Sequence, residues 1–361
     1  MNPANSIRVL EAITPSRIGG AEVYVTELCS RLPNCGIDTL LFCPTGRTFV
    51  DYAKKSDLEP ITWNTYGKLD PLTAIRLTRL IKSSNCQAVH THLSTASLLG
   101  AFAAKLAKVP SVAHVHGMNS AFSFKFADRI IAVSEAVKAN LAVQGLEKNV
   151  HVVYNGVDME RFAPVDVGDA RSKTCLQHAG PVFGVFGRLS VEKGQLVAIE
   201  AFAKAFPNRQ DAVLLVVGDG SNEQMLRNRA SELGVSDKVR FIAFTREIGD
   251  LIASCDAVLV PSLKEGFGLT AVNAMAMSRP VIASRVGGLP EVIVEGETGL
   301  LAEPGNVDSL ADAMREISAD STLAQQMGQA GRLRAVEKFE INKQIAEVAA
   351  ILIKKENRQI R

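Results

Sequence analysis

Arg188 and Lys193 are a pair of residues whose types and spacing point to chemistry. Arg188 closely follows an apolar, strand-like segment, and Lys193 lies five positions later, just before a helix-like segment. A guanidinium offers a planar fork of donors and an ammonium offers a compact charge, so the two side chains can converge on the oxygens of a diphosphate. The alternative interpretation is an exposed polar loop that binds nothing.

A second polar segment follows the strand-like run that ends at Val260. It consists of Glu265, Gly266, Phe267, Gly268, Leu269 and Thr270. A helix-like run begins near Gly268, so the amides of Leu269 and Thr270 are donors at the positive end of a helix and favour phosphate. The carboxylate of Glu265 would repel phosphate, and its oxygens suit sugar hydroxyls instead. The alternative role for Glu265 is to cap the helix.

The chain contains no Asp-x-Asp triplet, so a carboxylate pair that holds a divalent metal against a diphosphate is not evident. The charge on a departing nucleotide would then be neutralised by Arg188, Lys193 and helix amides. We therefore expect neither a metal nor a cofactor.

Four histidines occupy two strand-like segments in the first half of the chain: His90, His92, His114 and His116. Within each pair, a spacing of two places both side chains on one face of a strand. A metal site would need a further ligand, and no carboxylate or cysteine lies near these histidines in the sequence. From the residues alone, His92 at the end of its strand fits a histidine that is satisfied within the fold.

Gly19 and Gly20 end the loop after the first strand-like segment, directly before a helix-like segment that contains Glu22. Paired glycines let a backbone approach an anion that a helix N-terminus favours, although a tight turn without a ligand fits the pattern equally well. The loop is neither a dinucleotide fingerprint nor a Gly-Lys-Ser/Thr phosphate loop.

The elements that must position these residues alternate between apolar strands and amphipathic helices along the whole chain. This alternation predicts an α/β fold of two doubly wound, Rossmann-like parallel-sheet domains that face each other across a cleft, with ligands at the carboxyl ends of the strands. The predicted strands are Ile7–Ile13, Thr39–Phe42, Ala88–His92, Ser111–His116, Arg129–Val133, Val182–Phe186, Val213–Val217, Val239–Phe241, Ala257–Val260 and Val281–Ala283. The predicted helices are Ala21–Leu32, Pro71–Ile81, Thr95–Lys105, Glu135–Leu141, Leu196–Ala205, Glu223–Leu233, Ile248–Ser254 and Leu269–Met277. After the last predicted strand, helices follow to the end of the chain, with Ile341–Lys354 the last.

The alternation pauses in the turn-rich stretch Asn155–Pro164, and Val165–Gly180 is polar without periodicity, which predicts a linker. We expect one domain over residues 1–165 and another over 166–340. The final helix, at about 341–361, would pack back onto the first domain.

The composition excludes several classes of protein. A length of 361 residues suits two domains, and a net charge of +2 does not indicate a nucleic-acid binder. The six cysteines form no Cys-x-x-Cys pair, so reduced core thiols are expected. No signal peptide precedes the first strand and no stretch approaches a membrane span, which favours a cytoplasmic protein.

Three alternating phenylalanines, Phe122, Phe124 and Phe126, surround Lys125 in a short segment between two predicted strands. They form either a ridge that faces an acceptor or a membrane, or three aromatic side chains that pack partly into the core.

Several ordered motifs resemble those of the family 4 (group 1) retaining glycosyltransferases, which have the GT-B fold, and the resemblance covers nearly the whole chain. In the first half these are Gly19-Gly20-Ala21-Glu22, His90-Thr91-His92, His114-Val115-His116-Gly117, Ala132-Val133-Ser134-Glu135 and Asn155-Gly156-Val157-Asp158 with Arg161-Phe162. In the second half they are Gly187-Arg188-Leu189 with Glu192-Lys193-Gly194, Gly218-Asp219-Gly220, Glu265-Gly266-Phe267-Gly268 and Gly287-Gly288-Leu289-Pro290-Glu291.

The resemblance implies that the second domain binds a nucleotide-sugar donor and the first an acceptor. Arg188 and Lys193 would hold the donor diphosphate, with Gly19 and Gly20 closing from the other domain. Glu265 would contact the donor sugar, with the segment 266–270 on the phosphate or sugar, and His116 would lie beside the anomeric centre. Glu22 and His92 are the implied acceptor contacts. In this family the acceptor attacks the face that the nucleotide leaves, and no nucleophile of the enzyme is needed.

Asn273 departs from the family pattern, which has a second glutamate eight positions after Glu265. That glutamate usually holds the ribose hydroxyls with two acceptor oxygens, whereas an asparagine offers one acceptor oxygen and two donors. We expect Asn273 to bind the ribose less tightly.

The resemblance therefore implies a metal-independent, retaining, hexosyltransferase-like enzyme that moves a sugar from a nucleoside-diphosphate sugar, with a UDP-sugar favoured, to a glycan or lipid-linked acceptor. The implied setting is bacterial cell-surface polysaccharide or lipopolysaccharide assembly, in the cytoplasm or peripherally at the inner face of the membrane. The alternative is a non-catalytic GT-B protein that binds a sugar or nucleotide, which the departure at Asn273 would fit.

Overall fold

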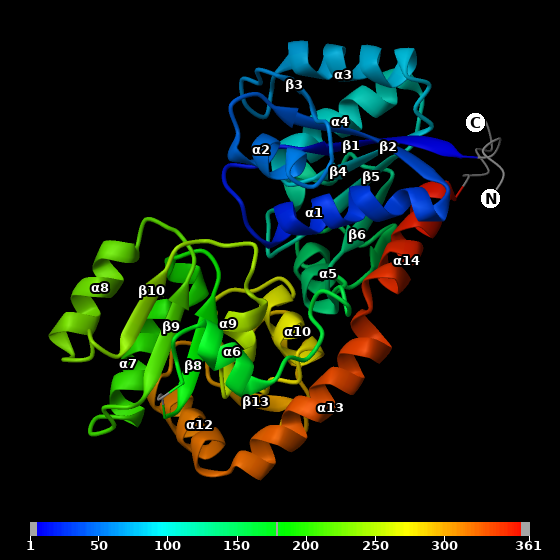
Figure 1. The fold of residues 1–361 in the computed structure, drawn as a ribbon. Coiled ribbons are helices and arrows are strands. Elements are labelled where there is room, and N and C mark those ends of the chain that lie inside the picture. The colour runs from blue at the N-terminus through cyan, green and yellow to red at the C-terminus, as the bar shows by residue number, and fades with distance from the viewer. Residues whose placement is uncertain (1–5, 178–179, 355–361) are drawn as a thin grey trace. The chain divides into compact units, whose positions relative to one another are not determined.

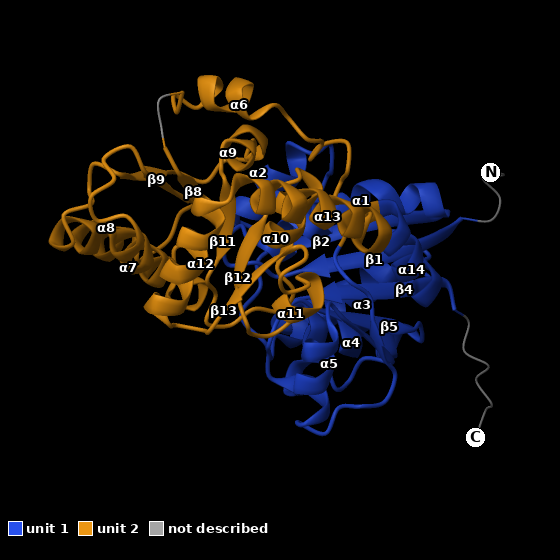
Figure 2. Ribbon diagram, turned by 90° about the horizontal axis from the view of Figure 1, so that it is seen from below, with its two compact units in different colours: residues 1–155, 342–361 blue, residues 156–341 orange. Residues whose placement is uncertain are grey.

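The computed structural model describes residues 6–177 and 180–354, and these divide into two compact units (Figure 2). Unit 1 contains residues 1–155 and 342–361, and unit 2 contains residues 156–341. The boundary expected at residue 165 lies inside unit 2. Each unit is built on one parallel sheet, as the alternation of strands and helices predicted.

Unit 1 contains a seven-stranded parallel sheet in the order β3-β2-β1-β4-β5-β6-β7. Its strands are β1 (Ile7–Ile13), β2 (Ile37–Pro44), β3 (Ile61–Trp63), β4 (Ala88–His92), β5 (Ser111–Val115), β6 (Arg129–Ala132) and β7 (Val150–Val152). Its helices are α1 (Gly20–Arg31), η2 (Leu32–Cys35), α2 (Thr48–Lys54), α3 (Pro71–Ser83), α4 (Ser94–Ala107), η3 (Ala121–Ser123) and α5 (Glu135–Ala142). Every residue of the central strands β4 and β5 is buried, as expected when helices cover both faces of a parallel sheet.

The helix α14 (Ile341–Ile353) belongs to unit 1 from its second residue onward, although it follows unit 2 in the sequence (Figure 1). The guanidinium of Arg129 on β6 donates to the backbone oxygens of Ile351 and Lys354, at 2.6 and 2.5 Å. These bonds give acceptor oxygens at the end of the helix a cationic partner, which ties α14 to the sheet.

Unit 2 contains a six-stranded parallel sheet in the order β10-β9-β8-β11-β12-β13. Its strands are β8 (Val182–Phe186), β9 (Val213–Val217), β10 (Val239–Ile242), β11 (Ala257–Val260), β12 (Val281–Ser284) and β13 (Gly299–Ala302). Its helices are α6 (Val167–Lys173), η4 (Val191–Lys193), α7 (Gln195–Ala205), α8 (Glu223–Glu232), α9 (Gly249–Ala253), α10 (Leu269–Ala276), α11 (Leu289–Val292), α12 (Val307–Ala319) and α13 (Ser321–Phe339).

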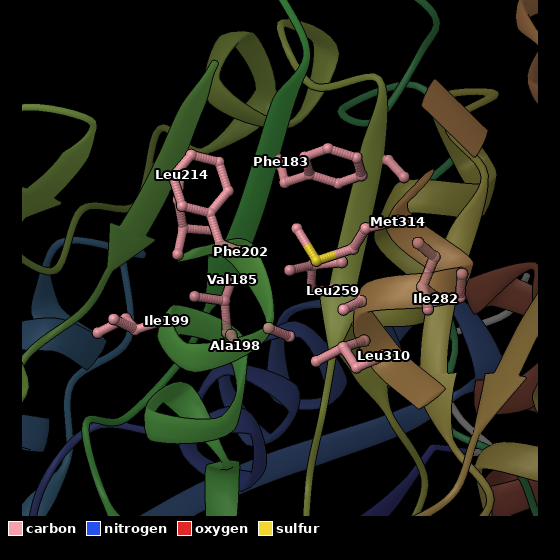
Figure 3. Close-up of a cluster of buried hydrophobic side chains, with 14 of the residues drawn as sticks. Phe183, Val185, Ala198, Ile199, Phe202, Leu214, Leu259, Ile282, Leu310 and Met314 are labelled. Atoms are coloured by element: carbon pink, nitrogen blue, oxygen red, sulfur yellow. The ribbon is translucent and has the colours of Figure 1, made fainter. Parts of the chain in front are cut away.

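The main core of unit 2 lies between its sheet and the helices α7 and α12 (Figure 3). Phe183 on β8 and Leu259 on β11 face Phe202 of α7 and Met314 of α12, and all four side chains are fully buried. Such close packing makes the sheet a rigid scaffold that holds the loops at its carboxyl edge in place.

The structure corrects the linker predicted over Val165–Gly180. The helix α6 occupies part of this segment, and its N-terminus is capped by Asp166. Arg171 Nη2 donates to both carboxylate oxygens of Asp256, at 3.0 and 2.9 Å. A polar helix of only seven residues shows no clear periodicity in the sequence, because tertiary contacts rather than an apolar face hold it. His178 lies outside the described residues.

Candidate functional site

The polar segments of unit 2 meet because β8 and β11 are neighbours in the middle of its sheet. Parallel neighbours end at the same edge, so the loops after these strands are adjacent. A small pocket lies at this edge. It is lined by Val185, Phe186, Lys193, Leu259, Val260, Pro261, Ser262, Glu265 and Thr270. The structure therefore brings Lys193, from one polar segment that the sequence singled out, together with Glu265 and Thr270 from the other.

Lys193 and Glu265 form an ion pair at this pocket, with Nζ 2.6 Å from Oε2. The same Oε2 accepts a hydrogen bond of 3.1 Å from the hydroxyl of Ser262, and Oε1 accepts one of 3.2 Å from the amide of Gly266. The carboxylate is 12% exposed and the lysine side chain 36%. Both charges are thus compensated, while the ammonium stays accessible to a ligand.

Arg188 lies in the loop after β8, exposed, and its guanidinium makes no hydrogen bond or ion pair with a described residue. Its backbone is fixed, because the buried side chain of Gln195 donates a hydrogen bond of 2.8 Å to the Arg188 carbonyl oxygen. A rigid backbone with a free guanidinium suits capture of an anion.

The loops after β8 and β11 are packed so closely that only a glycine fits at position 194. Gly194 has a φ of +68°, and a Cβ there would lie 1.9 Å from the carbonyl oxygen of Pro261. The amide of Leu263 also donates a hydrogen bond of 2.8 Å to the carbonyl oxygen of Glu192. The position of Lys193 against the second loop is therefore determined by backbone contacts.

The helix α10 begins at this edge, and no side chain caps its N-terminus at Gly268. The hydroxyl of Thr270 lies 3.4 Å from the carbonyl oxygen of Phe186, which places the first turn against β8. Asn273 is half-buried and three positions after Thr270, so the two share a face of the helix. The ring of Phe267 does not line the pocket: it is buried and packs on Phe339, with ring centroids 5.5 Å apart.

Unit 1 contains a buried polar cluster that the sequence predicted only in part. Glu11 on β1 accepts from His90 Nδ1 at 3.1 Å and from His92 Nε2 at 2.8 Å. His92 Nδ1 lies 3.0 Å from His116 Nε2. The expectation that no carboxylate lies near the histidines holds along the sequence but is wrong for the folded chain. Glu11 and His90 are direct partners across β1 and β4.

Stacked rings complete this cluster. His114 is paired with His92 in the register of β4 and β5, and its ring stacks on that of His116 at 4.4 Å with an interplanar angle of 9°. The buried ring of Tyr24, from α1, meets both His114 and His116 edge-on at 5.3 and 5.7 Å. The rings are thus confined on more than one side, which fixes their orientation.

Burial and hydrogen bonding shift the pKa values of several side chains in the cluster. Burial alone would raise the pKa of the Glu11 carboxyl, but the charge and hydrogen bonds of His90 and His92 lower it to about 2. Burial, with His90 adding to it, lowers the pKa of His92 to about 4. Burial also lowers the pKa values of His114 and His116 well below their usual range. At neutral pH Glu11 is therefore an ionised carboxylate, and the imidazoles of His92, His114 and His116 are neutral.

Five of the polar side-chain atoms in this region are buried without a hydrogen-bond partner among the described residues. They are Tyr24 Oη, His90 Nε2, His114 Nδ1, His114 Nε2 and His116 Nδ1. Ring nitrogens of His90, His92 and His114 lie within 4.8 Å of one another, so these three are the described residues that could hold a metal ion. Two of them, His90 and His92, also contact the Glu11 carboxylate, as histidine ligands of zinc commonly contact a carboxylate.

The remaining residues singled out in unit 1 lie at the start of α1. This helix begins at Gly20, and Gly19 precedes it in an extended conformation without a side-chain cap. Glu22 is buried within the first turn. The two glycines thus leave backbone amides at a helix N-terminus, as the sequence predicted.

Two family models match the chain on either side of the unit boundary. Residues 18–161 match the model described as Glycosyltransferase Family 4, and residues 167–334 match the one described as Glycosyl transferases group 1. Together with the two parallel-sheet units, these matches identify the chain as a member of the family 4, group 1 glycosyltransferases, which have the GT-B fold.

Curated relatives and solved structures agree with this assignment. The chain is 28% identical to the Escherichia coli UDP-Gal:alpha-D-GlcNAc-diphosphoundecaprenol alpha-1,3-galactosyltransferase, with 89% of this chain and 90% of that protein covered. It is 26% identical to the Bacillus anthracis N-acetyl-alpha-D-glucosaminyl L-malate synthase, with 92% and 93% covered. The fold matches Anabaena Alr3699/HepE in complex with UDP and glucose, with a TM-score of 0.86, 25% identity, and 97% and 100% of the two chains covered.

Proposed function

We propose that this glycosyltransferase moves a sugar from a UDP-sugar to a glycan or lipid-linked acceptor, with retention of anomeric configuration and without a metal. The observation that carries the proposal is the Lys193–Glu265 ion pair in a pocket at the carboxyl edge of the unit 2 sheet. Arg188, whose exposed guanidinium has no partner among the described residues, lies in the loop after β8 but does not line this pocket. Cations suit the diphosphate, and the carboxylate suits sugar hydroxyls.

The ion pair gives the donor a way to organise its own site. A diphosphate that approaches Lys193 competes with Glu265 for the ammonium, since both are anionic. Once the lysine turns to the phosphate, the carboxylate keeps the hydrogen bonds from Ser262 and Gly266 and has an oxygen available for sugar hydroxyls. Binding of the complete donor would thus exchange one ion pair for two sets of contacts.

Departure of the nucleotide leaves negative charge on the diphosphate and positive charge at the anomeric carbon. Arg188, Lys193 and the amides at the start of α10 stabilise the departing diphosphate electrostatically, so no metal is required. The acceptor hydroxyl attacks the face that the nucleotide leaves, and the departing phosphate accepts its proton. His116 and Gly20 of unit 1 assist the sugar and the diphosphate in this scheme.

Relatives support the choice of nucleotide and acceptor class. Anabaena Alr3699/HepE, which is 26% identical, is also known in complex with UDP-glucose, with a TM-score of 0.84 and 96% of this chain covered. The E. coli relative is named for UDP-Gal and for a diphosphoundecaprenol-linked sugar. A lipid-linked acceptor in cell-surface polysaccharide or lipopolysaccharide assembly is the proposed setting.

A surface of unit 1 supports a peripheral position at the inner face of a membrane. We define the aromatic-basic face as Phe102, Lys105, Leu106 and Lys108 from α4 and its C-terminus with Phe122, Lys125 and Phe126 from the η3 segment, all exposed. Lys125 Nζ lies 4.6 and 5.0 Å from the ring centroids of Phe122 and Phe126. Amphipathic aromatic rings with lysines suit the headgroup region of an anionic bilayer.

The donor site is tested by calorimetric titration of UDP into the full chain and into Arg188→Ala and Lys193→Ala. Losing a charge-assisted hydrogen bond costs about 1.5–3 kcal/mol, so each variant should bind UDP about 10- to 150-fold more weakly. Lys264→Ala, an exposed lysine of the same loop, is the matched control and should bind normally. Unchanged affinity in both site variants would overturn the proposed diphosphate site.

Transfer itself is tested with UDP-sugars and lipid-linked sugars, with NMR of the product. An axial product linkage from an axial donor, formed in the presence of EDTA, is the expected outcome. Tight UDP binding without transfer to any acceptor would instead favour the non-catalytic alternative.

A further inference from the structure

The hydrogen bonds of the buried cluster in unit 1 form one continuous chain. Glu11 Oε2 lies 2.8 Å from His92 Nε2, and His92 Nδ1 lies 3.0 Å from His116 Nε2. Glu11 and His92 are fully buried, so water does not compete for these bonds. The chain therefore connects a carboxylate on β1 with the histidine that the proposed function places beside the donor sugar.

The position of each hydrogen in this chain follows from the carboxylate. An ionised carboxylate can only accept, so His92 Nε2 carries a hydrogen. A neutral imidazole has a single N–H, which leaves His92 Nδ1 as an acceptor. His116 Nε2 must then donate to it, because two lone pairs would otherwise face each other at 3.0 Å. His116 Nδ1 is consequently left with a lone pair and without a hydrogen.

We propose that Glu11 is a positioning residue that acts through His92 to hold His116 as its Nε2–H tautomer, so that His116 Nδ1 accepts a hydrogen bond from a hydroxyl of the donor sugar or of the acceptor. This inference rests on the proposed function. His116 Nδ1 is one of the buried atoms that lack a partner among the described residues, so a hydroxyl donor would satisfy it.

The fixed tautomer also limits what His116 can do. With its hydrogen committed to His92, the ring cannot donate through Nδ1, so it orients a hydroxyl rather than protonating a leaving group. Stacking on His114 and the edge of Tyr24 oppose a flip of the ring, which would put Cδ2 in the place of Nδ1 and Cε1 in the place of Nε2. The orientation of the His116 ring is thus set by His114 and Tyr24, whereas the place of its hydrogen is set by Glu11 through His92.

The tautomer is measured directly by NMR of the full chain labelled with 15N-histidine, through two-bond correlations between ring nitrogens and ring hydrogens. We expect a protonated Nε2 and an unprotonated Nδ1 for His116, assigned by comparison with His116→Gln. A hydrogen on Nδ1, or a stoichiometric metal ion bound to these histidines by elemental analysis, would overturn the proposal.

Glu11→Gln tests the series of hydrogen bonds from Glu11 to His116, because a carboxamide offers a donor as well as an acceptor to His90 and His92. We expect kcat for transfer to fall about 10- to 100-fold with little change in the KM for the donor, together with a changed His116 tautomer. Glu11→Asp, which keeps the acceptor chemistry, should recover part of the activity and the parent tautomer. Equal kcat and an unchanged tautomer in Glu11→Gln would sink the idea.

UDP affinity separates this proposal from the proposed function. The nucleotide contacts proposed in unit 2 do not involve Glu11, so both Glu11 variants should bind UDP as the parent chain does. A parent chain that fails to transfer sugar contradicts the proposed function, whereas a parent chain that transfers sugar with His116 protonated on Nδ1 contradicts only the role of Glu11.

Discussion

At the scale of single residues, the candidate donor site depends on charges that can change partners. Lys193 pairs with Glu265 at 2.6 Å, yet its side chain is 36% exposed. An ion pair with this much solvent contact adds little net stability, so exchanging it for a phosphate costs little. Arg188, which has no such partner among the described residues, is ready to bind first.

Asn273→Glu tests whether position 273 faces the ribose. A carboxylate offers two acceptor oxygens to the ribose hydroxyls, so we expect UDP to bind about 5- to 150-fold more tightly, the range for about 1–3 kcal/mol. The gain should vanish with a UDP analogue that lacks both ribose hydroxyls. Asn228→Glu on α8 adds the same charge at an exposed position and serves as the control. No gain at position 273 would show that it does not contact the ribose.

Sequence reasoning proposed site residues in unit 2, of which the structure brings Lys193 and Glu265 together, but it missed Glu11. Arg188, Lys193 and Glu265 follow strands, and loops at one edge of a parallel sheet are easily expected to meet. Glu11 lies inside an apolar strand, and no neighbouring motif points to a role for it. Only the strand order, with β1 beside β4, places it against His90 and His92. A charged residue within an otherwise buried strand was the one available signal.

At the scale of elements, the β8 and β11 loops act as one unit because their backbones touch. Gly194 ends the turn η4 with a φ of +68°, next to the carbonyl oxygen of Pro261. This contact sets where Lys193 stands relative to Glu265. The geometry of the charges therefore depends on a residue that has no side chain.

Gly194→Ala should lower both stability and UDP affinity. The left-handed backbone costs an alanine about 1–2 kcal/mol, and the Cβ would also meet the Pro261 oxygen, which must push the loops apart. Gly234→Ala is the matched control, since Gly234 has a φ of +67° and nothing within 4 Å of the added Cβ. Thermal unfolding should show a larger loss for Gly194→Ala, and calorimetry weaker UDP binding in that variant alone. Equal losses of stability and of UDP affinity in the two variants would contradict the idea that the contact between the β8 and β11 loops positions Lys193.

Sequence patterns predicted most strands of both sheets, and the strands β8, β9 and β11 have the predicted bounds, because buried parallel strands are continuous apolar runs between helices. The helix α6 and the strands β3, β7 and β13 were not predicted. The three strands lie at sheet edges and pair on one side only, and α6 is held by contacts such as the Arg171–Asp256 ion pair, so tertiary contacts rather than a local pattern determine these elements.

At the scale of the whole molecule, the cationic residues are unevenly distributed. Between Tyr66 and Ala127 the only acidic residue is Asp70, which is buried and caps α3. Seven exposed cations occupy the same stretch: Lys68, Arg76, Arg79, Lys82, Lys105, Lys108 and Lys125. No described helix is long and apolar enough to cross a membrane. Attachment to a bilayer would therefore rely on surface contacts, and this stretch contains the aromatic-basic face.

Binding to vesicles tests that face on the intact protein. Each cation near an anionic surface contributes about 1 kcal/mol, so Lys125→Glu should reduce sedimentation with phosphatidylglycerol vesicles about 5-fold or more. Phe122→Ser should weaken binding by removing an exposed ring that would enter the headgroup region. Leu333→Ser on α13, which removes a more exposed apolar side chain of unit 2, is the control and should sediment as the parent does.

Changing the lipid composition of the vesicles and the salt concentration distinguishes binding to an anionic bilayer from nonspecific adhesion. Electrostatic attraction requires weaker binding to phosphatidylcholine vesicles and a loss of binding as salt shortens the screening length. UDP affinity should stay unchanged in all three variants, since none of them belongs to the proposed donor site. If Leu333→Ser lost as much binding as Lys125→Glu, the attachment would not involve the aromatic-basic face. A lipid-linked acceptor would then have to reach the enzyme by another surface.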